Sequence, residues 1–200
     1  MGLSKFFRVA GLVGVIGGYA ASAAAVPIFF AGTGHYYDFV SAPGISWNAA
    51  NTAAQSSIYG GASGHLATLT SFAEDFFVHS NRGALAELWV GGFQSPAGQL
   101  VTTAGWTWVN GEGTFPGVNG GLVYSNWLPG EPNDFYGLAS EQNLAVAFNG
   151  VFGWNDEGAI GNIGGYVVEY DAVPEPGTLS LLGLGLASLA ARRRKKADVR

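Results

Sequence analysis

The pattern of apolar and polar positions predicts a domain in which helices come before most of the strands. A short strand is expected at residues 35–40. The helix that follows has Ser46 as its N-cap, and we expect it to end at Gly60 and Gly61. Its apolar residues recur at helical spacing: Trp47, Ala50, Ala54 and Ile58.

A second helix is predicted to begin after Ser71. Ser71 followed by Glu74 is a capping-box pattern, in which the two residues satisfy each other's backbone N–H groups. Phe72 and Phe76 are four residues apart, so we expect them to share one buried face. Residues 81–83 are expected to end this helix.

Short β candidates separated by Gly and Pro follow the helices. They are residues 88–93, 106–109, 144–148, 151–154 and 166–170. This order predicts an α+β fold with two helices packed on small antiparallel sheets. Residues 111–140 have no period, and a stretch of this length is either disordered or a functional loop. Its Trp and Tyr residues favour a functional loop.

The strongest hairpin signal in the chain is the Asn149-Gly150 pair. A type I′ two-residue turn at this pair places Asn143 opposite Asp156. Glu141 and residues 155–156 then emerge at the same end of the ribbon, so the register alone brings them together.

Composition and charge narrow the possible functions. The chain has no Cys, which excludes disulfides and thiolate metal sites. Eight of its nine Lys and Arg lie near the two ends, and only Arg82 lies within residues 26–173. That region has twelve Asp and Glu against one Arg, a formal charge of −11, which disfavours nucleic-acid binding.

Acidic residues gather in the second half of this region without any basic neighbour. No Lys or Arg occurs in residues 83–191. The gathered carboxylates are Glu131, Asp134, Glu141, Asp156 and Glu157. Converging like charges raise one another's pKa and destabilise the fold unless a cation is bound. Oxygen ligands alone suit Ca²⁺ at six to eight coordination. The ligand set that we predict is Glu131, Asn133, Glu141, Asn155 and Asp156.

Other interpretations of these residues remain open. The sequence around Glu131 is also ordinary turn chemistry, and the residues after Trp154 could form an Asx-turn. An enzyme, such as a polysaccharide hydrolase with two of the carboxylates as acid and base, is disfavoured, because carboxylates that hold a metal are unavailable for that work. His35, His65 and His79 share no ligand spacing, and no nucleophile elbow, Walker or dinucleotide motif is present.

The first 25 residues have the pattern of a secretory signal peptide. Lys5 and Arg8 precede an uncharged stretch at residues 9–18, and residues 21–25 are small. We expect residues 1–25 to form the signal peptide, with cleavage after Ala23 or Ala25, and residues 26–173 to form one domain.

The C-terminal segment, residues 174–200, resembles a PEP-CTERM sorting signal of exopolysaccharide-producing Gram-negative bacteria. Pro-Glu-Pro at residues 174–176 precedes an uncharged stretch at 178–191 and a basic cluster at 192–196. A helix of that stretch spans roughly 21 Å, short of the roughly 30 Å hydrocarbon core. The resemblance implies processing by a membrane-embedded exosortase. We therefore expect an exported protein that is membrane-associated until processed, then at the cell surface or extracellular.

The domain itself is similar to the C-type lectin-like fold across about residues 35–170. The matching segments, in order, are residues 64–71 with Glu74-Asp75, 89–92, 105–108, 124–127, 131–133, Glu141, 154–156 and 166–169. The usual cysteines are absent, and Asn143 and Val168 stand about where two of them are expected.

The Glu-Pro-Asn order at residues 131–133 resembles the mannose-type members. The resemblance implies a cis Glu131-Pro132 bond and a primary Ca²⁺ site at the five predicted ligands, completed by two adjacent sugar hydroxyls. Asn133 and Asn155 would donate to the hydroxyls, while Glu131 and Glu141 would accept from them. Two aromatic residues just past the motif are expected against the sugar: Phe135 and Tyr136.

The expected function is that of an exported calcium-dependent lectin for a neutral glycan or exopolysaccharide of mannose or glucose type. The alternative is a calcium-stabilised matrix or adhesion module that binds a protein partner without sugar.

Overall fold

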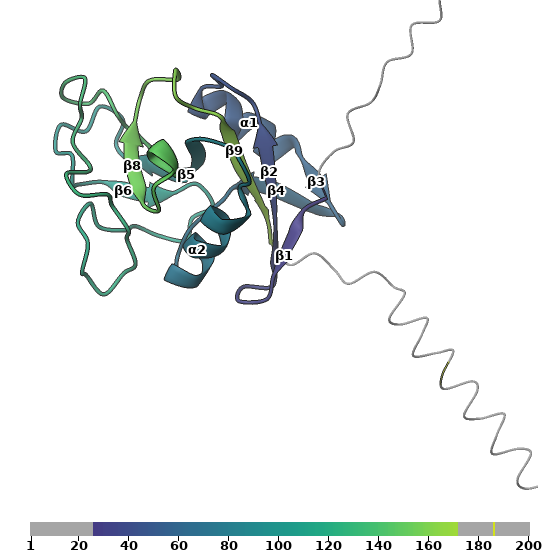
Figure 1. Cartoon of the computed structure of the whole chain (residues 1–200). Helices are drawn as coiled ribbons and strands as arrows, with labels where there is room; N and C mark the ends of the chain where they lie inside the picture. Colours follow the sequence, from purple (N-terminus) through teal and green to yellow (C-terminus); the bar gives the residue numbers. More distant parts are fainter. Residues whose placement is uncertain (1–25, 172–185, 187–200) are drawn as a thin grey trace, which may run out of the picture.

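The computed structural model describes residues 26–171 and Leu186 (Figure 1). The expected signal peptide and, apart from Leu186, the expected sorting segment lie outside these residues. Within the described part of the chain, no helix is long and apolar enough to span a bilayer.

Two helices and nine strands make up the described domain. The helices are α1 (Trp47–Ser56) and α2 (Phe72–Asn81), and a 3₁₀ turn, η1, spans Phe148–Gly150. The first strands are β1 (Ile28–Phe30), β2 (His35–Ser41), β3 (Ile58–Tyr59), β4 (Ala62–Leu66) and β5 (Leu88–Gln94). The remaining strands are β6 (Trp106–Trp108), β7 (Asn143–Val146), β8 (Trp154–Glu157) and β9 (Gly165–Tyr170).

The strands form one mixed sheet in the order β1-β2-β9-β5-β7-β8. In addition, β4 pairs with β9 and with β3, and β6 pairs with β5. All pairings are antiparallel except β5 with β9. The last strand therefore returns to the centre of the sheet, beside β2 (Figure 1). The α+β prediction is confirmed, with a mixed sheet.

The two helices pack on opposite faces of β9. Tyr166, Val168 and Tyr170 share a core with α1, whereas Val167 shares the other core with Val78 of α2. This alternation follows from the two-residue period of a strand.

Gly64 of β4 permits the close approach of α1. A Cβ at this position would lie 2.8 Å from the carbonyl oxygen of Ala54 and 2.6 Å from Cγ1 of Val168. Ala54 itself is fully buried. The helix therefore reaches the sheet because residue 64 has no side chain.

The first helix is shorter than predicted. Ser46 caps it by accepting a hydrogen bond from the N–H of Ala49, as expected. It ends at Ser56, however, and Ile58 lies in β3 with 72% of its surface exposed. Gly60 and Gly61 form the turn between β3 and β4 rather than ending the helix.

The predicted burial of Phe72 and Phe76 is wrong. Both are more than half exposed, at 60% and 51%, and α2 buries Glu74 and Asp75 instead. The Ser71 cap is confirmed, but Glu74 points inward because its carboxylate accepts from Tyr37 OH at 2.6 Å.

The predicted two-residue hairpin turn is also wrong. Asn143 pairs with Glu157 rather than with Asp156, a register shift of one residue. The connection spans residues 147–153 and contains η1, with Ala147 and Asn149 at positive φ. The second strand of the hairpin is therefore residues 154–157, not 151–154.

The long loop, residues 111–140, contains no helix or strand but packs into the core. Phe115 and Trp127 of the loop are buried against Trp106, Trp108 and Trp154. The loop therefore contributes side chains to the hydrophobic core.

Candidate functional site

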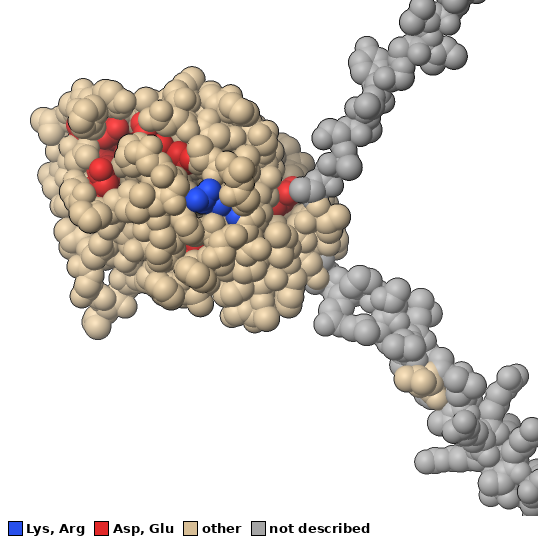
Figure 2. All heavy atoms as spheres, in the orientation of Figure 1, with Lys and Arg blue, Asp and Glu red and all other residues tan. Residues whose placement is uncertain are grey.

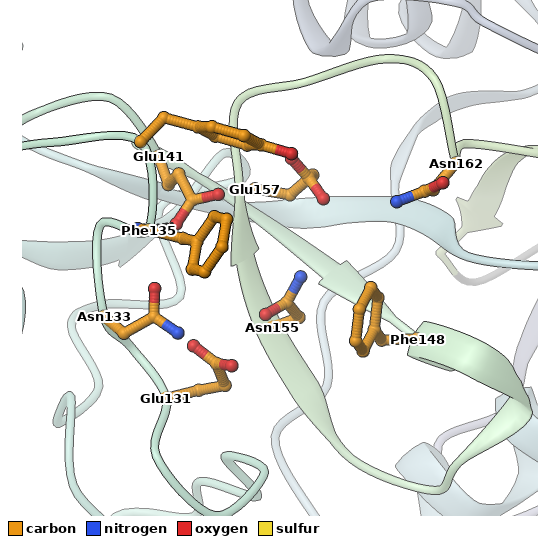
Figure 3. Close-up of a pocket in the computed structure, with 9 residues that line it drawn as sticks. Glu131, Asn133, Phe135, Glu141, Phe148, Asn155, Glu157 and Asn162 are labelled. Carbon is orange, nitrogen blue, oxygen red and sulfur yellow. Dashed lines mark hydrogen bonds between the residues drawn. The ribbon is translucent and has the colours of Figure 1, made fainter.

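A pocket of about 310 Å³ lies where the long loop meets the β7–β8 ribbon. Four of the five predicted ligands line it: Glu131, Asn133, Glu141 and Asn155. Figure 3 shows the side chains of Glu131, Asn133 and Asn155 directed toward one another across this space.

The fifth predicted residue, Asp156, lies behind the pocket wall with 1% of its surface exposed. Its carboxylate accepts hydrogen bonds from the backbone N–H groups of Asn133 and Asp134, each at 2.9 Å. Asp156 therefore fixes the loop segment that follows the cis Glu131-Pro132 peptide. That cis peptide is the one that the resemblance implies.

Two further carboxylates close the loop onto itself. Asp134 accepts from the N–H groups of Ala139 and Glu141, at 3.0 and 3.1 Å. Glu141 in turn accepts from the N–H of Phe135. Backbone groups thus hold the acidic side chains at the pocket, and no basic side chain of residues 26–171 does so.

The electrostatics of the pocket disfavour full ionisation. Burial, together with contact and charge from Asp156, raises the pKa of Glu131 to about 7. Burial, with the charges of Asp156 and Glu157, raises the pKa of Glu141 to about 7. Figure 2 shows several acidic side chains gathered around one hollow of the face drawn. Among the described residues, Arg82 is the only Lys or Arg. Arg82 donates to the backbone carbonyls of Leu85 and Gly150.

Glu87, which we did not predict, supports the site from beneath. Its Oε1 accepts from Nδ2 of Asn155 at 2.9 Å, and 1% of its surface is exposed. Burial, opposed by this hydrogen bond, raises the pKa of Glu87 to about 7. Among the described residues its Oε2 has no hydrogen-bond partner. The only feature of the sequence that could have indicated this role is the position of Glu87, an acidic residue directly before the apolar strand β5.

Aromatic and polar side chains complete the pocket. Phe135 and Tyr136 line it with 76% and 62% of their surfaces exposed. Phe148 was missed because the two-residue turn placed it in a paired strand. Asn162 was missed because it lies in the connection between β8 and β9, where the sequence has no motif. Glu157 also lines the pocket.

The carboxylates of the pocket surround one space, but they do not converge as a metal-ligating group of three. Within the described residues, no three carboxylates of this pocket place oxygens within 4.8 Å of one another. Like charges repel, and backbone N–H groups occupy the carboxylates of Asp156 and Glu141. The donor set of carboxylate and amide oxygens fits Ca²⁺ in chemistry. A bound ion would have to draw the loop and the ribbon inward.

Comparison with known sequences gives two matches. The model of the PEP-CTERM protein-sorting motif matches residues 172–195. Halomucin of Haloquadratum walsbyi is 36% identical over 143 residues, which is 68% of this chain but 1% of halomucin. The chain therefore spans a very small part of that relative's length. The sorting motif indicates an exported, cell-surface-directed protein.

Solved structures with the same fold include a carbohydrate-recognition domain and an antifreeze protein. The cow C-type carbohydrate-recognition domain of CD23, solved in the presence of a GlcNAc2Man3 oligosaccharide, is 25% identical with a TM-score of 0.53. That match covers 76% of this chain and 97% of the CD23 domain. A calcium-independent type II antifreeze protein is 17% identical with a TM-score of 0.50, covering 75% and 93% of the two chains. The described domain thus has the C-type lectin-like fold, and the segment after it carries the PEP-CTERM sorting motif.

Proposed function

We propose that this domain binds one Ca²⁺ in the pocket and, through the ion, two adjacent hydroxyls of a neutral sugar. The observation that carries the proposal is the pair Glu131 and Glu141. Their carboxylates line one pocket, each has a pKa raised to about 7, and none of the described residues that line the pocket is Lys or Arg. A divalent cation relieves this arrangement. The proposed ligands are Glu131, Asn133, Glu141, Asn155 and Asp156.

The two asparagines supply oxygen to the ion and N–H groups to the sugar. Asn155 donates one of its two amide hydrogens to Glu87. Its Oδ1 and its second N–H are then left for the ion and a hydroxyl. Asn133 supplies the same two groups from the loop, while Glu131 and Glu141 accept the hydroxyl protons.

Ion binding changes the shape of the pocket under this proposal. Ca²⁺ places its oxygen ligands at 2.3–2.6 Å, so the carboxylates must move toward one another from their present positions. The ion neutralises two of the three carboxylate charges of Glu131, Glu141 and Asp156. Asp156 then exchanges part of its bonding to the loop for bonding to the ion.

The Glu-Pro-Asn order favours sugars with equatorial 3- and 4-hydroxyls, of the mannose or glucose type. A neutral glycan, such as a surface exopolysaccharide, suits a domain with a formal charge of −11 over residues 26–173. One such site makes few contacts and binds weakly, so useful affinity requires several copies on one surface.

The sorting motif sets the cellular context of this proposal. An exosortase processes the segment at residues 174–200, after residues 1–25 have directed export. The chain is then associated with the membrane before processing, and at the cell surface or outside the cell afterwards.

A second candidate is a calcium-stabilised matrix or adhesion module with a protein partner. The exposed apolar side chains at and beside the pocket favour this alternative: Phe135, Tyr136 and Leu138. The antifreeze protein also shows that this fold exists in a calcium-independent form.

A glycan array probed with the full chain separates the candidates. The lectin proposal expects binding to mannose- or glucose-type glycans in Ca²⁺, loss in EGTA, and loss in Glu131→Gln. Glu112→Gln, which changes an exposed carboxylate outside the pocket, should bind as the natural chain does. Ca²⁺-dependent stabilisation without any glycan binding would favour the adhesion module.

A further inference from the structure

A second group of ionisable side chains lies away from the pocket, on three neighbouring strands. β9 runs between β2 and β4 at this part of the sheet (Figure 1). His65 of β4 pairs directly with Glu169 of β9. The β2–β9 register, continued by one step, places His35 opposite Asp171. Because Glu169 and Asp171 are two residues apart, all four side chains lie on one face.

The ligand atoms at this part of the sheet come close together in two groups of three that share Glu169: His35, Glu74 and Glu169, and His65, Glu169 and Asp171. Nδ1 of His35 lies 2.6 Å from Oε1 of Glu169 and 3.5 Å from Oδ1 of Asp171. Nε2 of His65 lies 3.2 Å from the same oxygen of Asp171. His65, Glu169 and Asp171 have ligand atoms that all lie within 4.8 Å of one another. This is the convergence that the carboxylates of the pocket lack.

The hydrogen bonding of His65 prepares Nε2 to bind a cation. Nδ1 of His65 lies 2.8 Å from the backbone carbonyl of Leu66 and must donate a proton to it. In the neutral ring, Nε2 therefore carries a lone pair, and this lone pair faces an anionic oxygen of Asp171. Two acceptors at this distance repel unless a proton or a metal ion lies between them. A backbone carbonyl on the far nitrogen is also the usual partner of a metal-bound histidine.

The remaining ligands are equally well fixed. Glu169 is 1% exposed, and its Oε2 accepts from the N–H of Thr68 at 2.8 Å. Its Oε1 also accepts from Tyr37 OH at 2.9 Å. Asp171 is half exposed, at 52%, so solvent and ions reach the cluster from that side.

We infer that His65, Glu169 and Asp171 bind a divalent transition-metal ion, with Zn²⁺ as the best fit, and that His35, which lies beside both carboxylates, joins them as a fourth ligand. Two imidazole nitrogens with two carboxylate oxygens suit zinc in four-coordinate geometry, whereas Ca²⁺ prefers oxygen ligands only. The two carboxylates balance the charge of the ion. In a chain without Cys, such an ion fastens β2, β4 and β9 together and stabilises the domain.

The test is metal uptake by the full chain, free of any histidine tag, after stripping with EDTA at pH 7.5. Zn²⁺ titration by calorimetry should show one tight site, and Co²⁺ should give the visible absorption of a four-coordinate site. His65→Ala and His35→Ala each remove a direct ligand and should weaken Zn²⁺ binding by more than about 100-fold. Loss of a residue that only supports a ligand typically costs roughly 10- to 100-fold. Asp171→Asn, at a half-exposed position, tests the same site with little risk to folding.

Two matched variants separate this site from other sources of binding. His79→Ala removes the third described histidine, which contacts Phe152, and should leave Zn²⁺ binding unchanged. Glu131→Gln should also leave it unchanged, because the calcium pocket is separate. No Zn²⁺ or Co²⁺ uptake by the natural chain would overturn the inference and leave a proton between His65 and Asp171. Equal uptake by the His65, His35 and Asp171 variants would overturn it as well.

Discussion

The indole Nε1 of Trp154 donates a hydrogen bond to Oδ2 of Asp75 at 2.9 Å, which joins β8 to α2. The same oxygen accepts from Tyr124 OH and from Nδ2 of Asn126, both in the long loop. Asp75 is 1% exposed. One buried carboxylate therefore anchors the loop that carries the pocket, in a chain that has no disulfide to do so.

Asp75→Ala should destabilise the domain by about 3 kcal/mol, because it leaves three hydrogen-bond donors without their acceptor. Urea unfolding followed by Trp fluorescence measures the change. Asp75→Asn keeps an acceptor oxygen in place and should lose less. Equal stability of Asp75→Ala and the natural chain would show that the loop is held by its aromatic packing alone.

Stability without Ca²⁺ should fall as pH rises from 5 to 8. Glu87, Glu131 and Glu141 each have a folded-state pKa of about 7, above the ordinary value of 4.5. The folded state thus binds more protons than the unfolded state in this range, and deprotonation destabilises it. The melting temperature in EGTA should drop by about 5 °C or more across this range. A melting temperature that rises with pH would contradict the account of the pocket.

Added Ca²⁺ should reverse this trend. The ion competes with protons for the same carboxylates, so its stabilising effect should be largest at pH 8 and smallest at pH 5. EGTA removes zinc as well as calcium. A fall in melting temperature in EGTA is therefore assigned to calcium only if added Ca²⁺ alone restores it. An equal Ca²⁺ effect at both pH values would place the ion at carboxylates that are already ionised at pH 5.

The double change Glu131→Gln and Asn133→Asp should move sugar preference toward galactose. It converts the Glu-Pro-Asn order to the Gln-Pro-Asp order of galactose-type lectins and exchanges the acceptor and donor that face the two hydroxyls. Competition with free mannose and free galactose on a glycan surface measures the shift. An unchanged preference would argue against direct contact between the hydroxyls and these two residues.

Gly64→Ala should destabilise the domain by about 1–3 kcal/mol. The added methyl group would lie 2.5 Å from Oγ of Ser57 and 2.8 Å from the carbonyl of Ala54, so α1 must shift. Gly121→Ala is the matched control, because its new Cβ has its nearest contact at 3.6 Å. Thermal unfolding of both variants gives the comparison, and similar losses in the two would indicate that α1 tolerates the shift.

The sequence predicted the secondary structure well where local hydrogen bonds determine it. Ser46 and Ser71 both cap the helices that they were expected to begin, because the capping hydrogen bond is local. The inward turn of Glu74 was not predictable, since it depends on Tyr37 from a distant strand. Glu74 and Asp75 occupy the inward face of α2, and Phe72 and Phe76 are exposed.

The sequence predicted most of the residues of the candidate site but not the pairing register of the β7–β8 hairpin that carries it. The turn signal at Asn149-Gly150 is local, yet the hairpin connection is longer because residues 147–150 form η1 and adjoining turns. Glu141 and Asn155 still meet, since a shift of one residue does not move the end of the ribbon. The meeting of His35 and His65 required the pairing of β9 with both β2 and β4, which no local spacing contains.

The most direct test of the calcium proposal is a calorimetric Ca²⁺ titration of the full chain beside Glu131→Gln and Glu112→Gln. We expect one site in the natural chain and in Glu112→Gln, with a dissociation constant near the 10⁻⁴ to 10⁻³ M of extracellular modules. Glu131→Gln should show no such site, and it should melt higher than the natural chain in EGTA because one repelling carboxylate is gone. Binding of Ca²⁺ to Glu131→Gln with undiminished affinity, or none to the natural chain, would contradict the proposal.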